Sequence, residues 1–258
     1  MRTVHVSRYV TPLREGGSLP AIVEADDDGL YVLKFRGAGQ GPRALVAELV
    51  AGELARGLGF AVPELVFVEL DAELARTEPD PEIQELIRAS AGLNLALDYL
   101  PGSVTYDPVA ERLEPALASE VVWFDAFVSN VDRTARNTNL LMWHRRLWLI
   151  DHGACLYFHH GTPWTAFGER ADDRFALIRE HVLLPRASEL PAADARLAPR
   201  LTAAMIDAVT ALIPDAWLSS DDGDAEAQRA AYADYLTRRV QGPRSFVEEA
   251  THARLSRV

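Results

Sequence analysis

The chain has one cysteine, Cys155, among its 258 residues. A single thiol cannot form an intrachain disulfide, and it excludes a zinc site built from cysteines. No apolar run reaches the roughly 18 residues that a membrane span requires, and the first ten residues lack the apolar region of a secretory signal. These absences predict a cytoplasmic protein with no membrane partner.

Positive charge is also scarce. The formal net charge is −12, which argues against binding nucleic acid through a broad phosphate-neutralising surface. We therefore expect no nucleic-acid partner. Lys34 is the only lysine, so the other 25 of the 26 cationic residues are arginines. Lysine supplies a compact charge on a flexible stem, whereas arginine is a planar fork. The solitary lysine therefore marks a position that needs an ammonium group.

The rest of the composition is typical of a globular protein, with 48% apolar and 25% charged residues. A chain of 258 residues is long enough for one large domain or for two lobes. Pro101-Gly102-Ser103 is the candidate boundary, because strand patterns dominate before it and helical patterns after it. The strands expected before the boundary are 4–10, 20–24, 30–35, 62–70 and 93–100.

A helix is expected from about Arg43 to Leu58, where Gly57 and Gly59 provide a stop. Glu48 lies near its middle and is the preferred partner for Lys34 if the helix packs beside the lysine strand. Glu53 is a weaker candidate, and both acids can also be read as ordinary solvated side chains. The acidic stretch 71–90 is expected to form one or two short helices.

Helical patterns follow the boundary, and they extend to the end of the sequence. The expected helices cover residues 116–128, 173–184, 195–212, 225–240 and 245–255. Residues 154–172 are rich in aromatics, histidines and glycines without clear periodicity, so we expect an ordered loop there. Within this second part, a polar loop and a hairpin interrupt the helices.

The polar loop contains Asp132 and Asn137 between apolar segments. The hairpin follows it as Thr138–Trp143 and Leu147–Ile150, and its second strand leads directly into Asp151 and a glycine. Two carboxylates and a carboxamide therefore flank one small hairpin. Hard oxygen ligands of this kind suit Mg²⁺, which binds one or two carboxylates together with substrate phosphates.

Three motifs in this order resemble the HipA-like kinases of the protein-kinase-like superfamily, with a more distant similarity to phosphoinositide kinases. They are Leu33-Lys34-Phe35, Asp132-Arg133-Thr134-Ala135-Arg136-Asn137 and Ile150-Asp151-His152-Gly153. The resemblance covers residues 14–153. It implies a two-lobed α+β kinase fold, with an antiparallel-sheet N-lobe carrying one helix (1–100) and a mainly helical C-lobe (101–258).

The resemblance also implies roles for individual residues. Lys34 would hold the α- and β-phosphates of ATP and Glu48 would orient it. Asp132 would accept the proton of the attacking hydroxyl, while Asn137 and Asp151 would bind Mg²⁺. The resemblance also implies that a connector meets the adenine and that a loop covers the phosphates. The connector residues are Asp98, Tyr99 and Leu100, and the loop residues are Gly16, Gly17 and Ser18.

The sequence departs from the family pattern at several positions. The phosphate loop lacks a full G-x-G-x-x-G motif, so an ordinary hairpin turn is an alternative reading there. Thr134 stands where related kinases often carry a cation, and Arg136 is preferred over Arg133 as the replacement. His152 replaces the phenylalanine of the usual Asp-Phe-Gly. Asn139 is a second carboxamide near the site, ranked below Asn137 as a metal ligand.

These observations predict an ATP- and Mg²⁺-dependent kinase that phosphorylates a hydroxyl group. The resemblance implies a protein serine or threonine as acceptor, with autophosphorylation. A small-molecule or lipid-headgroup kinase would use the same residues and is the first alternative. A nucleotide-binding pseudokinase that acts as a regulatory interaction module is the second. The acceptor itself is not encoded in any motif.

Overall fold

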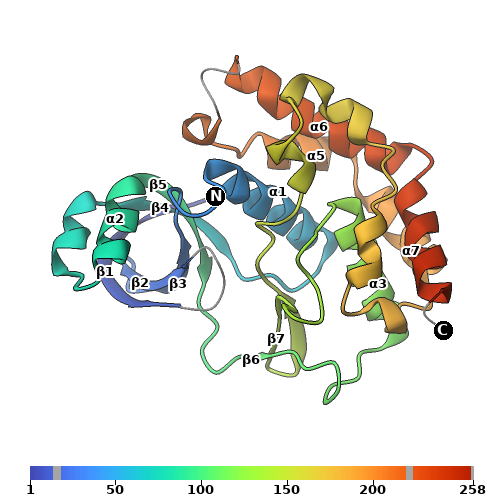
Figure 1. Ribbon diagram of the computed structural model, residues 1–258, viewed down its shortest axis with the longest axis horizontal. Coiled ribbons are helices and arrows are strands. Elements are labelled where there is room, and N and C mark those ends of the chain that lie inside the picture. Colours follow the sequence, from blue (N-terminus) through green and yellow to red (C-terminus); the bar gives the residue numbers. More distant parts are fainter. Residues whose placement is uncertain (14–18, 219–222, 257–258) are drawn as a thin grey trace.

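The structure is a computed structural model that describes residues 1–13, 19–218 and 223–256. Five strands close a barrel near one end of the molecule in the order β1-β2-β3-β5-β4 (Figure 1). The strands are β1 (Thr3–Pro12), β2 (Ala21–Ala25), β3 (Leu30–Lys34), β4 (Leu65–Leu70) and β5 (Gly92–Asp98).

The expectation of an antiparallel sheet is wrong for one pair of strands. Four of the five pairings are antiparallel, but β1 and β4 run parallel, with Thr3 opposite Phe67 and His5 opposite Glu69. This pairing closes the sheet into a barrel, so no strand edge is left unpaired. A local sequence pattern cannot predict the pairing of β1 with β4, because about sixty residues separate the paired positions.

Helix α1 (Pro42–Leu58) lies between the barrel and the helical part of the molecule (Figure 1). A proline occupies its first turn, where the missing N–H costs nothing. Gly59 ends the helix with φ of 93°, a left-handed conformation that glycine adopts without strain. Most of the side chains of α1 are buried, on more than one face of the helix. The helix is therefore packed on both sides rather than lying on the surface.

Stretch 71–90 forms the 3₁₀ segment η1 (Ala72–Thr77) and helix α2 (Pro81–Ala89), as short helical elements were expected there. Helix α2 covers the barrel and belongs to its core through Ile83 and Ile87. Among the described residues before the connector, α1 and α2 are the α-helices; α2 is one of the short helices expected in 71–90 and adds to the one helix of the implied N-lobe.

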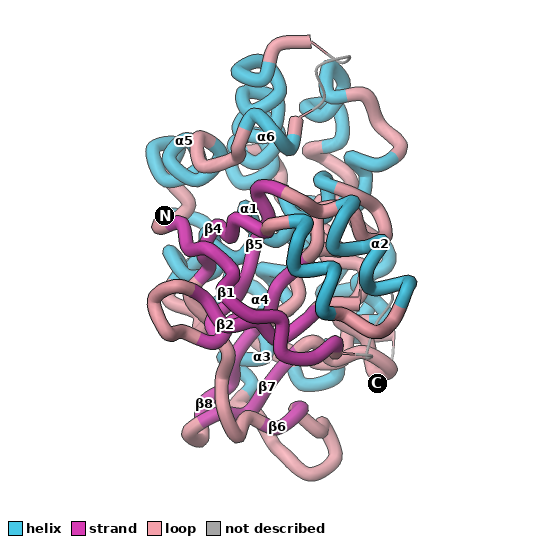
Figure 2. The backbone as a smooth tube through the Cα atoms, turned by 90° about the vertical axis from the view of Figure 1, so that its left-hand side faces the viewer, coloured by secondary structure: helices cyan, strands magenta, loops and turns pink. Residues whose placement is uncertain are grey.

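The later part of the chain is mainly helical around a small three-stranded sheet of order β6-β7-β8. This sheet and helices α5 and α6 lie at opposite ends of the molecule in both views (Figure 1; Figure 2). The elements are β6 (Val104–Thr105), α3 (Pro115–Phe127), β7 (Leu140–Trp143), β8 (Arg146–Leu149), α4 (Leu190–Leu197), α5 (Ala203–Thr210), α6 (Ala225–Gln241) and α7 (Ser245–Leu255).

Two of the expected helices are not continuous: 3₁₀ segments replace one of them and a 3₁₀ segment divides the other. Residues 173–184 form η4 (Ala176–Glu180) and the start of η5 (Leu184–Arg186), and Phe175 before them has φ of 60°. Residues 195–212 are divided between the end of α4, η6 (Ala198–Arg200) and α5. Pro199 removes a backbone donor within 195–212 and interrupts the helix there. The range 173–184 contains no proline; its path is set by the left-handed Phe175 and by the hydrogen bond from Val182 N to Arg133 O. The aromatic loop is ordered as η2 (Tyr157–His160) and η3 (Trp164–Arg170).

Two clusters of buried residues hold the fold together. One fills the barrel and extends to α2. The larger one contains buried residues of α1 and of all the helices from α3 to α7, and it also includes Leu95 and Leu97 of β5. The boundary expected near residue 100 falls in the connector between β5 and β6, and the division into lobes stays a prediction. Among the described residues, none of the helices has the length and apolar content needed to cross a bilayer.

Candidate active site

Lys34 ends strand β3 and its ammonium group contacts two carboxylates. Its Nζ lies 3.0 Å from Glu48 Oε2 on α1 and 2.5 Å from Asp151 Oδ1, just after β8. Only 11% of the lysine side chain is exposed. One lysine therefore joins the barrel, helix α1 and the turn after the hairpin. The pairing expected between Lys34 and Glu48 is present, and Glu53 instead pairs with Arg56.

The electrostatics of this group favour its charged form. Burial alone would lower the pKa of Lys34, but the charges of Asp151 and Glu48 outweigh it and the pKa is raised. Burial alone would raise the pKa of Glu48, but the Lys34 charge and the contact with His152 outweigh it and the pKa is lowered. Lys34 and Glu48 therefore remain an ion pair at neutral pH.

His152, in the position of the usual phenylalanine, is fully buried and faces the other side of Glu48. Its Nδ1 lies 3.6 Å from Glu48 Oε1, beyond hydrogen-bond length. Its ring meets the edge of Phe124 on α3, with centroids 6.3 Å apart. Neither ring nitrogen has a hydrogen-bond partner within the described part of the chain. His152 thus packs as an aromatic ring while keeping a polar face toward α1.

The polar loop gathers two amides on one carboxylate. Asn137 Nδ2 donates to Asp132 Oδ2 at 2.7 Å, and Asn139 Nδ2 donates to the same oxygen at 3.2 Å. The backbone N–H of Asp132 is held by Asn130 Oδ1 at 3.1 Å. In the described residues, no hydrogen bond ends on Asp132 Oδ1. The carboxylate is therefore oriented and keeps one oxygen for another partner.

Asn139, ranked below Asn137 as a metal ligand from the sequence, is the more buried of the two amides. It directly precedes β7 and is 9% exposed, whereas Asn137 is exposed in the loop. Asn139 and Asp151 have φ of 48° and 54°, in the left-handed region that asparagine and aspartate enter more readily than other non-glycine residues. Both are backbone conformations that tertiary contacts must hold in place. Because both amides donate to Asp132, their amide oxygens are left to face other groups.

The two arginines of the loop have different surroundings. Arg133 is 1% exposed and pairs with the buried Asp125 of α3 at 2.5 Å. Arg136 is exposed, and no ion pair or hydrogen bond of its side chain is seen among the described residues. The preference for Arg136 as the available cation therefore agrees with the burial of Arg133.

The predicted adenine connector follows β5. The N–H of Asp98 donates to Glu64 O and that of Tyr99 donates to Leu30 O, both at 2.9 Å, and Leu100 is buried. The backbone N–H groups of Asp98 and Tyr99 are thus already used within the protein. The predicted contact of this segment with adenine stays a prediction. The remaining predicted positions, Gly16, Gly17 and Ser18, lie outside the described residues.

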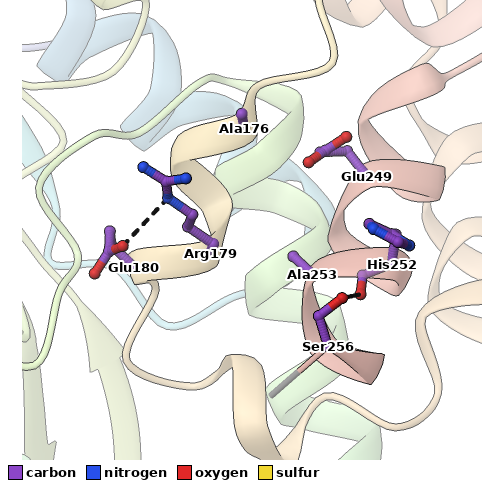
Figure 3. Close-up of a pocket in the computed structure, with 7 residues that line it drawn as sticks. All are labelled: Ala176, Arg179, Glu180, Glu249, His252, Ala253 and Ser256. Carbon is purple, nitrogen blue, oxygen red and sulfur yellow. Dashed lines mark hydrogen bonds and ion pairs between the residues drawn. The ribbon is translucent and has the colours of Figure 1, made fainter.

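Two surface cavities lie elsewhere. A cavity of about 540 Å³ opens between η4 and α7, with Arg179 and Glu180 paired on one wall and Glu249 and His252 on the other (Figure 3). A second one, of about 130 Å³, lies beside the end of α1 and β8. Lys34, Asp132 and Asp151 line neither of them.

Sequence reasoning missed three residues beneath the polar loop, namely Asp125, Asn130 and His181. Asp125 could have been noticed, because it is the only charged residue in the apolar run from Val121 to Val128. An acid at such a position is buried unless the helix is exposed, and a buried acid needs a partner. His181 had no comparable signal, since it lies about fifty residues away in an irregular segment.

Comparisons with known proteins identify the family and the fold. A family model described as HipA-like kinase matches residues 6–243. A crystal structure of the Helicobacter pylori proinflammatory kinase CtkA aligns with TM-score 0.57 and 13% identity, covering 98% of each chain, which shows a kinase-like mixed α+β fold.

Two crystal structures of the Golgi casein kinase align less well. The first aligns with TM-score 0.49 and 12% identity over 96% of this chain and 72% of the other. The second, with Mn/ADP bound, has the same score and identity over 100% and 75%. A search of curated proteins found no match. The family model covers most of the sequence, and the chain therefore belongs to the HipA-like kinases, a family of ATP-dependent phosphotransferases.

Proposed function

We propose that the chain transfers the γ-phosphoryl group of ATP to a hydroxyl group with the help of Mg²⁺. The observation that carries this proposal is the position of Lys34, whose ammonium group lies between Glu48 and Asp151. Phosphoryl transfer depends on positioning and on neutralising charge, more than on covalent chemistry. A lysine held at the junction of the barrel and the metal-binding turn can do both for the phosphates. The nucleotide would lie between residues 1–100 and residues 101–258.

The roles of the protein residues follow from their surroundings. Lys34 holds the α- and β-phosphates, and Glu48 keeps the ammonium group in place from the buried side. Asp132 accepts or orients the proton of the attacking hydroxyl through the carboxylate oxygen that the amides leave open. Arg136, the exposed cation of the loop, faces developing negative charge on the phosphoryl group.

The residues present fit a magnesium ion. In the described part of the chain, no three acidic, histidine or cysteine side chains cluster as a metal site. This agrees with Mg²⁺, which needs few protein ligands because phosphates and waters supply the rest. Asp151, whose side chain is 39% exposed, and the amide oxygen of Asn137, or that of Asn139, would hold it. When bound, the ion supplies charge neutralisation between the phosphates.

The acceptor that we propose is a serine or threonine of a protein, including residues of the chain itself. Membership of the HipA-like kinases supports this choice. The same membership, the single cysteine and the net charge of −12 support a cytoplasmic enzyme that does not act on nucleic acid.

Transfer of label from ATP tests the proposal. The purified protein is incubated with ATP labelled at the γ-position, with Mg²⁺ or with EDTA, and label in protein, in added hydroxyl compounds and in free phosphate is measured. We expect Mg²⁺-dependent label in the protein, reduced by Asp132→Ala and by Asp151→Ala on the order of 10³-fold. Asp207→Ala, at an exposed acid on α5, is the matched control and should retain activity.

The outcomes separate the alternatives. Label in an added small hydroxyl compound but not in protein would favour a small-molecule kinase. ATP that stabilises the protein thermally without any transfer would favour a pseudokinase. Label that persists in both site variants would contradict the assignment of the active site.

A further inference from the structure

Asp125 is a fully buried acid on α3, within the run Val121–Val128 that packs in the larger core. A carboxylate removed from water is costly unless hydrogen bonds and charge compensate it. Burial alone would raise the pKa of Asp125, but the Arg133 charge and the His181 contact outweigh it and the pKa is lowered. The group is thus a permanent anion inside the helical part.

Three side chains donate to this anion. Asn130 Nδ2 donates to Oδ1 at 2.9 Å, whereas Arg133 Nε at 2.5 Å and His181 Nε2 at 2.8 Å both donate to Oδ2. The tautomer of His181 follows from its other contact, because its Nδ1 accepts the N–H of Leu183 at 3.0 Å. A neutral His181 ring therefore carries its proton on Nε2, directed at the carboxylate.

Two of these partners, Asn130 and Arg133, flank Asp132 in the sequence and connect its backbone to Asp125. Asn130 receives the backbone N–H of Asp132 on its Oδ1 while it donates to Asp125 through its Nδ2. Arg133 follows Asp132 directly and is anchored to the same carboxylate. The backbone of Asp132 is thus held from both sides by a single buried acid.

Arg133 extends the connection to the metal-binding positions. Its Nη1 donates to the carbonyl of Asn139 and, at 3.4 Å, to the carbonyl of Ile150. Ile150 N also donates to Asn139 O at 3.1 Å. The guanidinium therefore joins the residue before β7 to the residue before Asp151.

The segment that ends at His181 is attached in the same way. Val182 N donates to Arg133 O at 3.1 Å, and Thr134 forms an isolated bridge with His181. The polar loop, the hairpin ends and this later segment thus converge on Asp125, although Asp125 itself makes no contact with Lys34 or Glu48.

We infer that Asp125 is a positioning residue, which sets the orientation of Asp132 and Asp151 through Asn130 and Arg133. This inference rests on the proposed kinase function. Its physical basis is that a displacement of about 1 Å in a reacting group costs on the order of 100-fold in rate. Asn130 bonds to Asp125 and to the Asp132 backbone, so the loss of its side chain leaves the contacts of Lys34 with Glu48 and Asp151 in place. The predicted signature is a lower kcat with an almost unchanged KM for ATP.

Two variants test this role from different directions. Asn130→Ala removes the link to Asp132 N and leaves both buried charges in place. Asp125→Leu combined with Arg133→Met removes both charges together, which keeps the core apolar and avoids an unpaired ion. We expect Asn130→Ala to lower kcat about 10- to 100-fold while KM for ATP changes less than about threefold. The double variant should lower kcat by a similar factor and also raise KM for ATP, because Arg133 holds the Ile150 carbonyl next to Asp151.

Ser119→Ala is the matched control. Ser119 is fully buried on α3, the helix that carries Asp125. Its hydroxyl donates to Pro115 O and accepts from Glu189 N, remote from the polar loop. It should lose stability comparably to Asn130→Ala and keep kcat within about twofold. Should folded Asn130→Ala also keep kcat within about twofold of wild type, the positioning role is refuted. If the double variant does not fold, Asn130→Ala alone decides.

Amide hydrogen exchange keeps the inference separate from the proposed function. Asn130→Ala should raise exchange across residues 130–139 and leave α6 unchanged, and Ser119→Ala should not affect this loop. An inactive wild-type protein with this exchange pattern would contradict the kinase proposal but support the anchoring role of Asp125. Unchanged exchange in the loop would overturn the anchoring role whatever the activity.

Discussion

Single residues carry the charge balance of the candidate site. Glu48 is the clearest case, because one fully buried carboxylate faces Lys34 with one oxygen and His152 with the other. Without the lysine this acid would be an uncompensated charge in the core between α1 and α3. The lysine therefore stabilises the fold in the absence of nucleotide, besides the role proposed for it in catalysis.

Glu48→Gln should show this coupling in its pH dependence. The pKa of Glu48 lies below its ordinary value of 4.5, so its stabilising contribution is complete above that pH and is lost as the pH falls below it. At pH 7 the variant should lose about 1.5–3 kcal/mol, the value of a hydrogen bond to a charged group. Urea unfolding should show this difference shrinking between about pH 5 and pH 3.

Glu85→Gln is the control for this measurement, because Glu85 is an exposed acid on α2. It should change stability by less than about 0.5 kcal/mol at any pH. A loss in Glu48→Gln that stays constant down to pH 3 would show that the carboxylate charge does not contribute.

At the scale of elements, the segment after Gly153 links α1 to α6. The Arg43 guanidinium of α1 donates to the carbonyl of His159. His159 Nδ1 lies 3.0 Å from the Tyr232 hydroxyl of α6, and its Nε2 lies 3.1 Å from His160 Nε2. Burial lowers the pKa of both histidines, and the positive charge of Arg43 adds to this effect.

Acid should therefore loosen this segment. Because both histidine pKa values lie below their ordinary value of 6.5, the stabilising contribution is complete above that pH and is lost as the pH falls below it. Protonation would also place charge beside Arg43. The other described neighbours of the two rings are Tyr232, Tyr157 and Phe158, and none of them is an acid that could compensate the charge. Amide exchange in residues 154–161, corrected for intrinsic rates, should rise from pH 7.5 to about 5.5.

His144→Gln, in the exposed turn between β7 and β8, should leave this response unchanged, whereas His159→Gln should flatten it. An equal response in both variants would mean that another group controls the segment.

At the scale of the whole molecule, the barrel and the helical part share more than α1. Trp217 in η7 (Asp215–Trp217) is 3% exposed and donates its indole N–H to Leu93 O at 3.0 Å. Its ring meets Phe67 of β4 edge-on, with centroids 5.6 Å apart. A single side chain from the helical part thus binds two barrel strands.

Truncation of this side chain should weaken the joint between the two parts. We expect Trp217→Ala to reduce the free energy of unfolding by about 3–5 kcal/mol, and Trp217→Phe to lose about 1 kcal/mol for the hydrogen bond, besides any packing change. Denaturant unfolding followed by circular dichroism measures both. Trp143 makes a comparable indole bond to Pro101 O at 2.9 Å, but in an exposed position where water can replace it. Trp143→Phe should therefore cost less than Trp217→Phe. Equal losses at the two tryptophans would contradict a special role for Trp217.

Much of the element order was predictable from local signals. Helix α7 (Ser245–Leu255) has the expected bounds, and α1 begins one residue before the expected start, because proline, glycine and apolar spacing act within a few residues. The region 173–184 was predicted as a helix and instead forms η4 and the start of η5, because Phe175 is in a left-handed conformation and Val182 N donates to Arg133 O of the polar loop. The parallel pairing of β1 with β4 escaped prediction because it joins strands far apart in the sequence.

The features of the site that depend on local sequence were also predictable, and those that depend on tertiary packing were not. The residue types were readable, since a solitary lysine, two acids and an amide around a hairpin indicate phosphate and metal chemistry. The contact of Lys34 with Glu48 was predictable from the spacing of a strand and a helix. Neither the contact of His152 with Glu48 nor the hydrogen bond of Asn139 to Asp132 follows from spacing, because each depends on how a turn is oriented within the packed core.

The sequence by itself determined the chemical groups available to this protein and the short elements that carry them. Local backbone preferences and side-chain chemistry act over a few residues, and they persist whatever surrounds them. Only the tertiary structure decided that Arg133 is buried while Arg136 is exposed, and that Asn130, Arg133 and His181 meet at the buried Asp125. The reason is that desolvation cost depends on the whole surroundings of a charge, so a buried ion is retained only where distant segments bring it partners.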